Sequence, residues 1–137
     1  MATMTVTTLH LSIFLGLYLI AAGLGGLVDG ARWAAMIDDL EGSPGLLYLL
    51  AALAFGAGAL IVWIHHHWTD PLAVVVTLIG YGALAEGLVL LVFPKAWFAL
   101  ARPLIAHLRV FAIVSILLGA LLLVAGLTGR ADPMVYI

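Results

Sequence analysis

Four long apolar runs constrain this chain more than any other feature of its sequence. They cover residues 9–28, 46–64, 72–93 and 108–127. Each run is close to the ~20 residues that a helix needs to cross a ~30 Å hydrocarbon layer. With 66% hydrophobic and 9% charged residues, the chain cannot cover its surface with polar groups as a soluble domain does. The sequence predicts an all-α polytopic membrane protein, with one four-helix transmembrane domain over residues 1–137.

Composition excludes several classes of protein. The formal net charge of −2 leaves no basic surface to neutralise nucleic-acid phosphates, so no nucleic acid is expected as a partner. Because the chain has no cysteine, disulfides, thiolate metal sites and covalent haem attachment are excluded. Residues 1–8 contain no Lys or Arg, and the first apolar run is too long for a signal peptide. We therefore interpret residues 9–28 as a permanent span.

Proline and capping residues mark the predicted helix boundaries. Ser43-Pro44 and Asp70-Pro71 each place a capping side chain before a proline, which predicts the starts of the second and third spans. Phe93-Pro94 predicts the end of the third span, because the residue before proline disfavours the α conformation. Gly30 and Gly129 are expected to be helix exits with left-handed backbone.

Two short connections have an amphipathic pattern. In residues 31–40 and 95–105 the apolar side chains recur at helical spacing, and each segment carries one tryptophan, Trp33 or Trp97. This pattern predicts a short helix lying at the membrane interface, with the tryptophan as its anchor. We interpret these helices as connectors that hold the spans in register; lipid sensing or partner docking is the alternative.

Basic residues predict the orientation in the membrane. The first and third connections carry Arg32, Lys95, Arg102 and Arg109, whereas the opposite side has only Arg130. Lys and Arg concentrate in cytoplasmic loops. The count therefore predicts that both termini and the loop at 65–70 lie on the non-cytoplasmic side.

The two halves of the chain resemble each other. A shift of 64 positions pairs several glycines and tryptophans, including Gly16 with Gly80, Gly23 with Gly87 and Trp33 with Trp97. A one-residue slip then pairs Gly56 with Gly119. The pattern predicts a tandem duplication with units at about 9–64 and 72–127. Two units with the same orientation form a parallel repeat about an axis along the membrane normal.

Four segments in the second half of the chain carry a family resemblance. They are Glu86-Gly87-Leu88, residues 93–97 (Phe-Pro-Lys-Ala-Trp), Leu108-Arg109 and the span containing Gly119. Over residues 80–127 the chain resembles the YjeT-like family of small bacterial inner-membrane proteins, whose function is not established. The first half looks like a degenerate copy, with Ala22 where the glutamate would be. The four-span arrangement is also similar to DoxX-like proteins, although the second span lacks the acid expected there. These resemblances imply a bacterial inner-membrane location and supply no catalytic residue.

Glu86 is the sharpest candidate for a functional residue, because it lies inside the third span. A carboxylate in the membrane is costly unless it faces protein, finds a partner or takes up a proton. Small neighbours such as Gly82 and Gly87 permit close approach of another helix. We expect Glu86 to fix helix packing, with Arg109 or His107 as its partner. A proton relay or an ion-coupling site is the alternative.

The run His65-His66-His67, with Asp70 and His10 on the same predicted side, is a candidate metal site. Neighbouring helical side chains diverge by ~100°, so three adjacent histidines cannot reach one ion. We interpret them as an interfacial cap near a helix C-terminus and expect no bound metal or other cofactor.

Pairs of small residues four positions apart predict close helix packing. The packing glycines are Gly23, Gly56, Gly58, Gly87 and Gly119. Gly56 and Gly58 lie on different sides of their helix, so one side is expected to pack internally and the other against a partner. We therefore predict a non-catalytic accessory or structural subunit that packs against a larger membrane complex or against itself. The alternatives are a small proton-linked carrier using Glu86 and a metal or redox protein using the external histidines.

Overall fold

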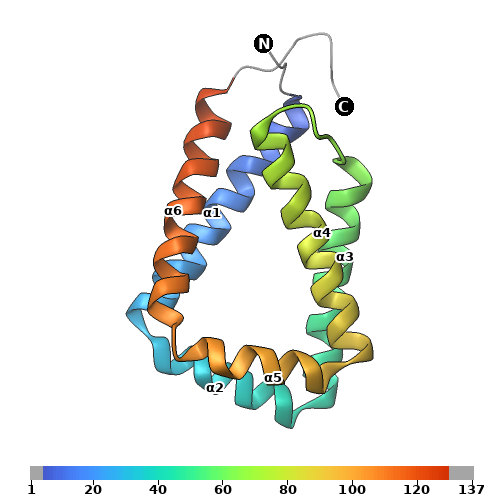
Figure 1. Ribbon diagram of the computed structural model, residues 1–137, viewed down its shortest axis with the longest axis vertical. Helices are drawn as coiled ribbons and strands as arrows, with labels where there is room; N and C mark the ends of the chain where they lie inside the picture. Colours follow the sequence, from blue (N-terminus) through green and yellow to red (C-terminus); the bar gives the residue numbers. More distant parts are fainter. Residues whose placement is uncertain (1–4, 130–137) are drawn as a thin grey trace.

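The computed structural model describes residues 5–129, which form six helices and no strand (Figure 1). The helices are α1 (Val6–Val28), α2 (Gly30–Gly42), α3 (Pro44–Ile64), α4 (Pro71–Val92), α5 (Pro94–Ile105) and α6 (Leu108–Thr128). The four apolar runs form α1, α3, α4 and α6, and the two amphipathic connections form α2 and α5. The predicted all-α architecture is confirmed. Arg130, used in the orientation count, lies outside the described residues.

Four of these helices are long and apolar enough to cross a membrane. Helices α1, α3, α4 and α6 have 21 to 23 residues and contain windows with a mean hydropathy of 2.1 to 2.8. At 1.5 Å per residue the shortest of them is about 32 Å long, which matches the hydrocarbon layer. The chain is therefore a small integral membrane protein.

Side-chain caps start the helices where the sequence predicts them. The side chains of Ser43 and Asp70 each accept a hydrogen bond from the backbone N–H three residues later. Asp29 does the same for α2, so Gly30 begins that helix and does not follow one as an exit. The prediction of left-handed glycines was wrong, because no glycine in residues 5–129 has a positive φ. Gly129 leaves α6 in extended backbone.

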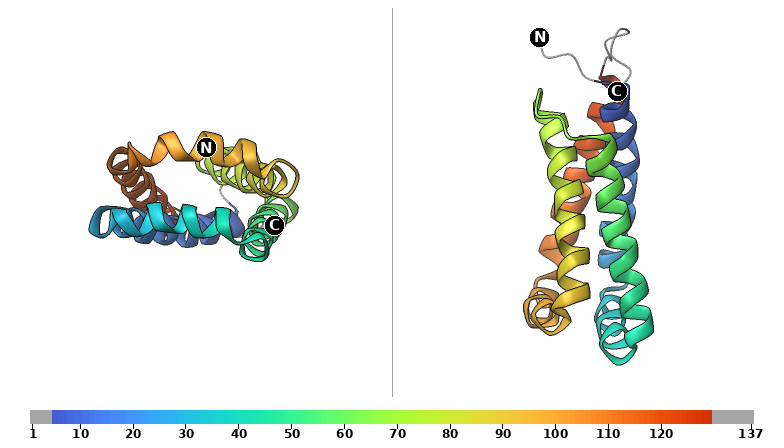
Figure 2. Two further views of the ribbon diagram at one scale, coloured as in Figure 1. Left: turned by 90° about the horizontal axis from the view of Figure 1, so that it is seen from below. Right: turned by 90° about the vertical axis from the view of Figure 1, so that its right-hand side faces the viewer.

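The spans pack as two antiparallel pairs, α1 with α6 and α3 with α4 (Figures 1 and 2). Glycines bring the helix backbones of each pair together. A Cβ added at Gly16 would lie 2.7 Å from the carbonyl oxygen of Gly119, and one added at Gly87 would lie 2.4 Å from the backbone nitrogen of Phe55. The first span thus packs against the last, and the two middle spans pack against each other.

The two pairs form a frame that is closed at both ends. At the end with the 65–70 loop, here called the loop end, the pairs meet in a small core of Leu9, Leu72 and Leu122. From there they separate toward α2 and α5, which lie side by side across the opposite end, here called the base (Figure 1). The starts of α1 and α4 therefore lie near each other, whereas their ends lie apart.

The buried positions of the two halves agree with the predicted repeat. Six buried residues of α1 match buried residues of α4 at a spacing of 64: Thr8/Leu72, Leu9/Ala73, Ser12/Val76, Gly16/Gly80, Gly23/Gly87 and Gly26/Leu90. In α3 and α6 the buried pairs Ala51/Ala112 and Gly58/Gly119 are spaced by 61. Gly58, and not Gly56, therefore takes the place of Gly119. The duplication itself stays a prediction.

Candidate functional site

Glu86 lies on the inner face of α4, which is turned toward the other helix pair. Ile79 packs against the core at the loop end. Glu86 follows Ile79 by seven residues, or two helical turns, so it lies on the same side of α4 but closer to the base. There the pairs have separated, and the Glu86 side chain is exposed. It is six residues, or about 9 Å, from the end of α4 at Val92.

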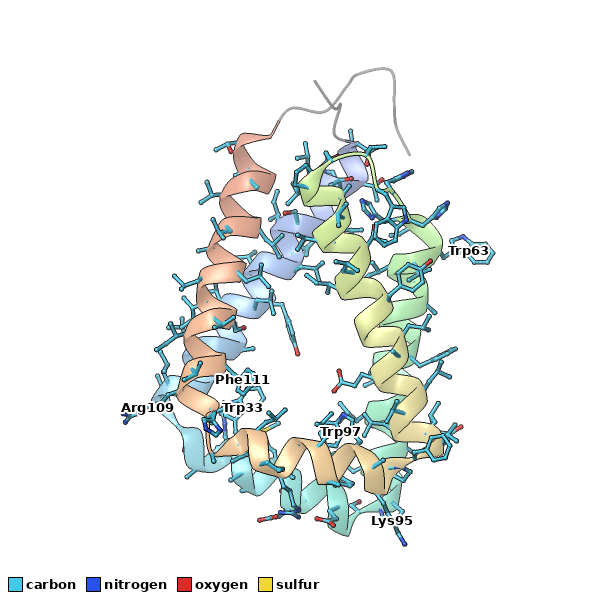
Figure 3. The ribbon with its side chains drawn as sticks, viewed as in Figure 1. Trp33, Trp63, Lys95, Trp97, Arg109 and Phe111 are labelled. Carbon is cyan, nitrogen blue, oxygen red and sulfur yellow. The ribbon has the colours of Figure 1, made fainter. Side chains whose placement is uncertain are left out.

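The partners predicted for Glu86 are not brought to it. Within residues 5–129 the ion pairs all involve Arg102, and Glu86 makes no hydrogen bond. Arg109 is the second residue of α6 and points away from the frame (Figure 3). His107 is exposed at the start of the same helix. The α1/α6 pairing explains this outcome, because it places the start of α6 beside the end of α1 and away from α4.

A pocket of about 180 Å³ lies where α1 and α6 meet near the base. Its lining residues include Ala22, Gly26 and Phe111. These positions lie two turns toward the base from Leu15, Leu19 and Leu118, which pack against the core at the loop end. The pocket and Glu86 therefore occupy matching positions on the two inner faces.

Aromatic side chains surround the base of this region. Trp33 of α2 and Phe111 of α6 line the pocket, and Trp97 of α5 lies on the side of its helix that faces the middle of the frame (Figure 3). Trp97 also stacks edge-to-face on Phe98, with ring centroids 5.2 Å apart. The indole Nε1 of Trp33 is buried without a hydrogen-bond partner. The two predicted interface anchors therefore also border the inner faces.

His65 is the centre of a buried polar network that the sequence did not predict. Its side chain is 0% exposed. Its Nε2 lies 2.7 Å from Thr8 Oγ1 of α1, and its Nδ1 lies 3.0 Å from Thr77 Oγ1 of α4. Thr77 donates its hydroxyl proton to the carbonyl of His67, so its oxygen must accept from the Nδ1–H of His65. Thr8 is then free to donate to Nε2 of a neutral ring.

The network ties the two helix pairs together at the loop end. His65 follows α3, and the ring bonds α1 on one side and α4 on the other. Burial lowers the pKa of His65 below its ordinary 6.5, and the nearby His67 lowers it further. The neutral ring that the hydrogen bonds require is therefore also the form that burial favours.

The residues of the candidate metal site do not converge as the ligands of one ion. The His67 ring lies edge-to-face against that of His65, with ring centroids 5.2 Å apart. His66 lies within hydrogen-bond distance of the Val62 carbonyl, and its ring stacks on that of His67. Asp70 caps α4, and His10 is exposed on α1. Within residues 5–129 no three His, Asp or Glu side chains converge as metal ligands do. Both nitrogens of His65 face threonine hydroxyls.

Arg102 joins the two short helices at the base. It lies 3.0 Å from Asp38 and also pairs with Glu41, and these two carboxylates raise its pKa. Arg102 follows Asp38 by 64 residues, so the two occupy equivalent positions in the predicted repeat. Equivalent positions near a two-fold axis face each other, and identical charges there would repel. The opposite charges allow α2 and α5 to bind one another.

The glycines of α3 differ in their surroundings. A Cβ added at Gly58 would lie 2.2 Å from the backbone nitrogen of Leu84, whereas one added at Gly56 would have no atom within 4 Å. Gly58 thus belongs to the α3/α4 contact, as Gly23, Gly87 and Gly119 belong to their own helix contacts. The spacing of the two glycines predicts that they lie on different sides of α3. In the structure the side with Gly58 is packed and the side with Gly56 is open.

Comparisons with protein-family models, with curated proteins and with solved structures found no match. The resemblance to YjeT-like and DoxX-like proteins stays a prediction.

Proposed function

We propose that this protein is a non-catalytic membrane subunit that binds a membrane-embedded partner, or a second copy of itself, through the open face of α3. We define this face by Gly45, Ala52 and Gly56, which lie within about 40° of one another around the helix. All three are exposed, and neither glycine would bring an added Cβ within 4 Å of another atom. The observation that carries the proposal is this set of small, exposed residues on a membrane span, which the exposed Trp63 follows on the same side of the helix.

Exposure to lipid does not by itself explain why α3 has small residues at these positions. The matched burial of Gly58 and Gly119 relates α3 to α6 by 61 residues. Ile113 and Leu117 are therefore the α6 equivalents of Ala52 and Gly56, and both are exposed. The two spans thus differ at these two positions, which hold bulky side chains on α6 and small ones on α3. Small residues let another helix approach closely, which supports a partner at α3.

Two further observations support this assignment. Only 11% of the apolar window of α3 is buried within the chain, against 22% to 28% for the other spans. The serine hydroxyls are bonded to backbone: Ser12 donates to the Leu122 carbonyl, Ser115 donates to the Leu19 carbonyl, and Ser43 caps α3. The described residues therefore offer no serine poised beside a base as a nucleophile. A bacterial inner membrane, with the loop end outside, is part of the same proposal.

The test is assembly in native membranes. Gly56→Leu should abolish in-membrane cross-linking and co-purification of the partner, while helicity and thermal stability stay unchanged. Gly82→Leu is a matched control, because Gly82 is also free of neighbours within 4 Å but lies on α4. It should assemble as the wild type does. If the wild-type chain runs as a lone monomer in native-membrane nanodiscs, or if both variants assemble equally, the proposal fails.

A proton-linked carrier remains the second candidate, because Glu86 faces the space between the helix pairs and has no protein partner there. No contact in the described residues favours the metal or redox alternative.

A further inference from the structure

The charge of Glu86 is not balanced by the protein. Glu86 is the only acidic residue within the four spans, and it makes no ion pair or hydrogen bond within residues 5–129. The cations at this end of the frame have other surroundings. Lys95 and Arg109 point away from the frame (Figure 3), and Arg102 binds the acids of α2. The Arg32 guanidinium lies against α1, where its Nη2 would be 3.3 Å from a Cβ added at Gly25. A lone carboxylate about 9 Å inside a span is costly unless a cation or a proton accompanies it.

The surroundings of Glu86 are apolar and aromatic. The pocket on the opposite inner face is lined by Ala22, Gly23, Gly26, Trp33, Leu108, Phe111, Ala112 and Ser115. Its one hydroxyl, that of Ser115, already donates to the Leu19 carbonyl. Trp97 borders the same region from the base (Figure 3). The faces of aromatic rings attract cations, and they do so most strongly for weakly hydrated organic cations. An apolar pocket of this kind does not supply the oxygen ligands that a metal ion needs.

We propose that the inner faces of the two helix pairs bind a lipophilic organic cation, with Glu86 as its counter-charge. An apolar arm of the ligand enters the 180 Å³ pocket between α1 and α6, and its positive centre lies toward Glu86 and the tryptophans. A neutral acyl chain would fill the same region but would leave the carboxylate unpaired. The charge of Glu86 therefore selects a cation over a neutral or anionic molecule of equal size.

The two halves of the chain also define the charge of the ligand. In the predicted repeat, Ala22 occupies the position equivalent to Glu86, because the two are separated by 64 residues. One half thus provides a carboxylate and the other half provides a glycine-lined pocket that receives an apolar group. A single carboxylate matches a single positive charge, so the ligand is monovalent.

The experiment measures binding of tetraphenylphosphonium by equilibrium dialysis with the full chain in nanodiscs. Empty nanodiscs measure the partition of each ion into lipid. Tetraphenylborate, which has the same shape and the opposite charge, then measures binding to the chain without charge pairing. We expect saturable binding of the cation only. Glu86→Gln should weaken it about tenfold or more, because one partner of a desolvated charge pair is lost. Glu86→Asp should retain binding, and Asp39→Asn, which removes an exposed carboxylate of α2, should not change it.

Two results would overturn the proposal. Equal binding of the cation and the anion to the wild-type chain would show that the region selects only apolar shape, as it would for an acyl chain. Unchanged cation affinity in Glu86→Gln would show that the carboxylate is not the counter-charge. If Glu86→Gln does not fold, the comparison of the two ions on the wild-type chain decides. None of these measurements depends on the open face of α3, so the partner proposal stands or fails separately.

Discussion

Replacing Gly58 with alanine should destabilise the protein, whereas the same change at Gly56 should not. The two positions lie in one helix, two residues apart, so they share backbone conformation and depth in the membrane. An added Cβ at Gly58 would lie 2.2 Å from the backbone nitrogen of Leu84. At Gly56 it would meet no atom within 4 Å.

The magnitude follows from the displacement that alanine requires. Ordinary van der Waals contact begins at 3.4 Å, so α3 and α4 must move apart by about 1.2 Å (3.4 − 2.2) near Gly58. Overpacking of this kind costs about 1–3 kcal/mol. Alanine gains up to about 1 kcal/mol over glycine in helix propensity, and this gain is common to both variants. Gly58→Ala should therefore be about 1–3 kcal/mol less stable than Gly56→Ala.

The assay is reversible unfolding by sodium dodecyl sulfate in mixed micelles, followed by circular dichroism. The wild type and both variants are measured side by side, and the difference between the variants is the quantity of interest. Equal stability of the two variants would refute the α3/α4 contact at Gly58, and with it the assignment of Gly56 to an outer face.

Three other predictions test separate parts of the frame. Because the folded pKa of His65 is lowered, the unfolded state binds more protons below the ordinary value of 6.5. Stability should therefore be constant above that pH and fall as the pH drops through 6.5 toward the folded pKa; His65→Ala should remove this slope, and His66→Ala should keep it. Arg102→Ala should destabilise the protein less than Gly58→Ala, with an effect that shrinks at high salt, because its ion pairs are exposed. Cysteines introduced at Thr69 and Asp39 of this cysteine-free chain should differ toward an impermeant reagent on intact cells, with Thr69 labelled and Asp39 protected; the reverse pattern would invert the orientation.

Local features of the sequence were sufficient to predict the helices. The length of each apolar run and the caps at Ser43 and Asp70 depend only on neighbouring residues, and the structure confirms them. The amphipathic pattern around Trp33 and Trp97 similarly predicted α2 and α5. The prediction of left-handed helix exits at Gly30 and Gly129 was wrong. Gly30 begins α2 after the capping Asp29, and Gly129 leaves α6 in extended backbone.

The pairing of helices could not be predicted, because it depends on contacts between residues far apart in the chain. Periodicity gives the faces of a helix but not the neighbour that each face meets. The predicted pairing of Glu86 with Arg109 is not found for this reason, because α6 packs on α1. The His65 network was missed because its threonines, Thr8 and Thr77, lie 57 and 12 residues away. A threonine within an apolar run, near the same membrane depth as a histidine, was the available signal.

The pairing of the first span with the fourth is the central structural claim, and a disulfide cross-link tests it most directly. A Cβ built on Gly26 of α1 lies 3.3 Å from the Cβ of Ala112 in α6, close to the separation found in disulfides. The double variant Gly26→Cys/Ala112→Cys should form an intramolecular cross-link rapidly when oxidised in native membranes. Ala51 is the equivalent of Ala112 in α3, so Gly26→Cys/Ala51→Cys is the matched control and should not cross-link. Efficient cross-linking of the control pair, or none in the first pair, would contradict the arrangement of the helices.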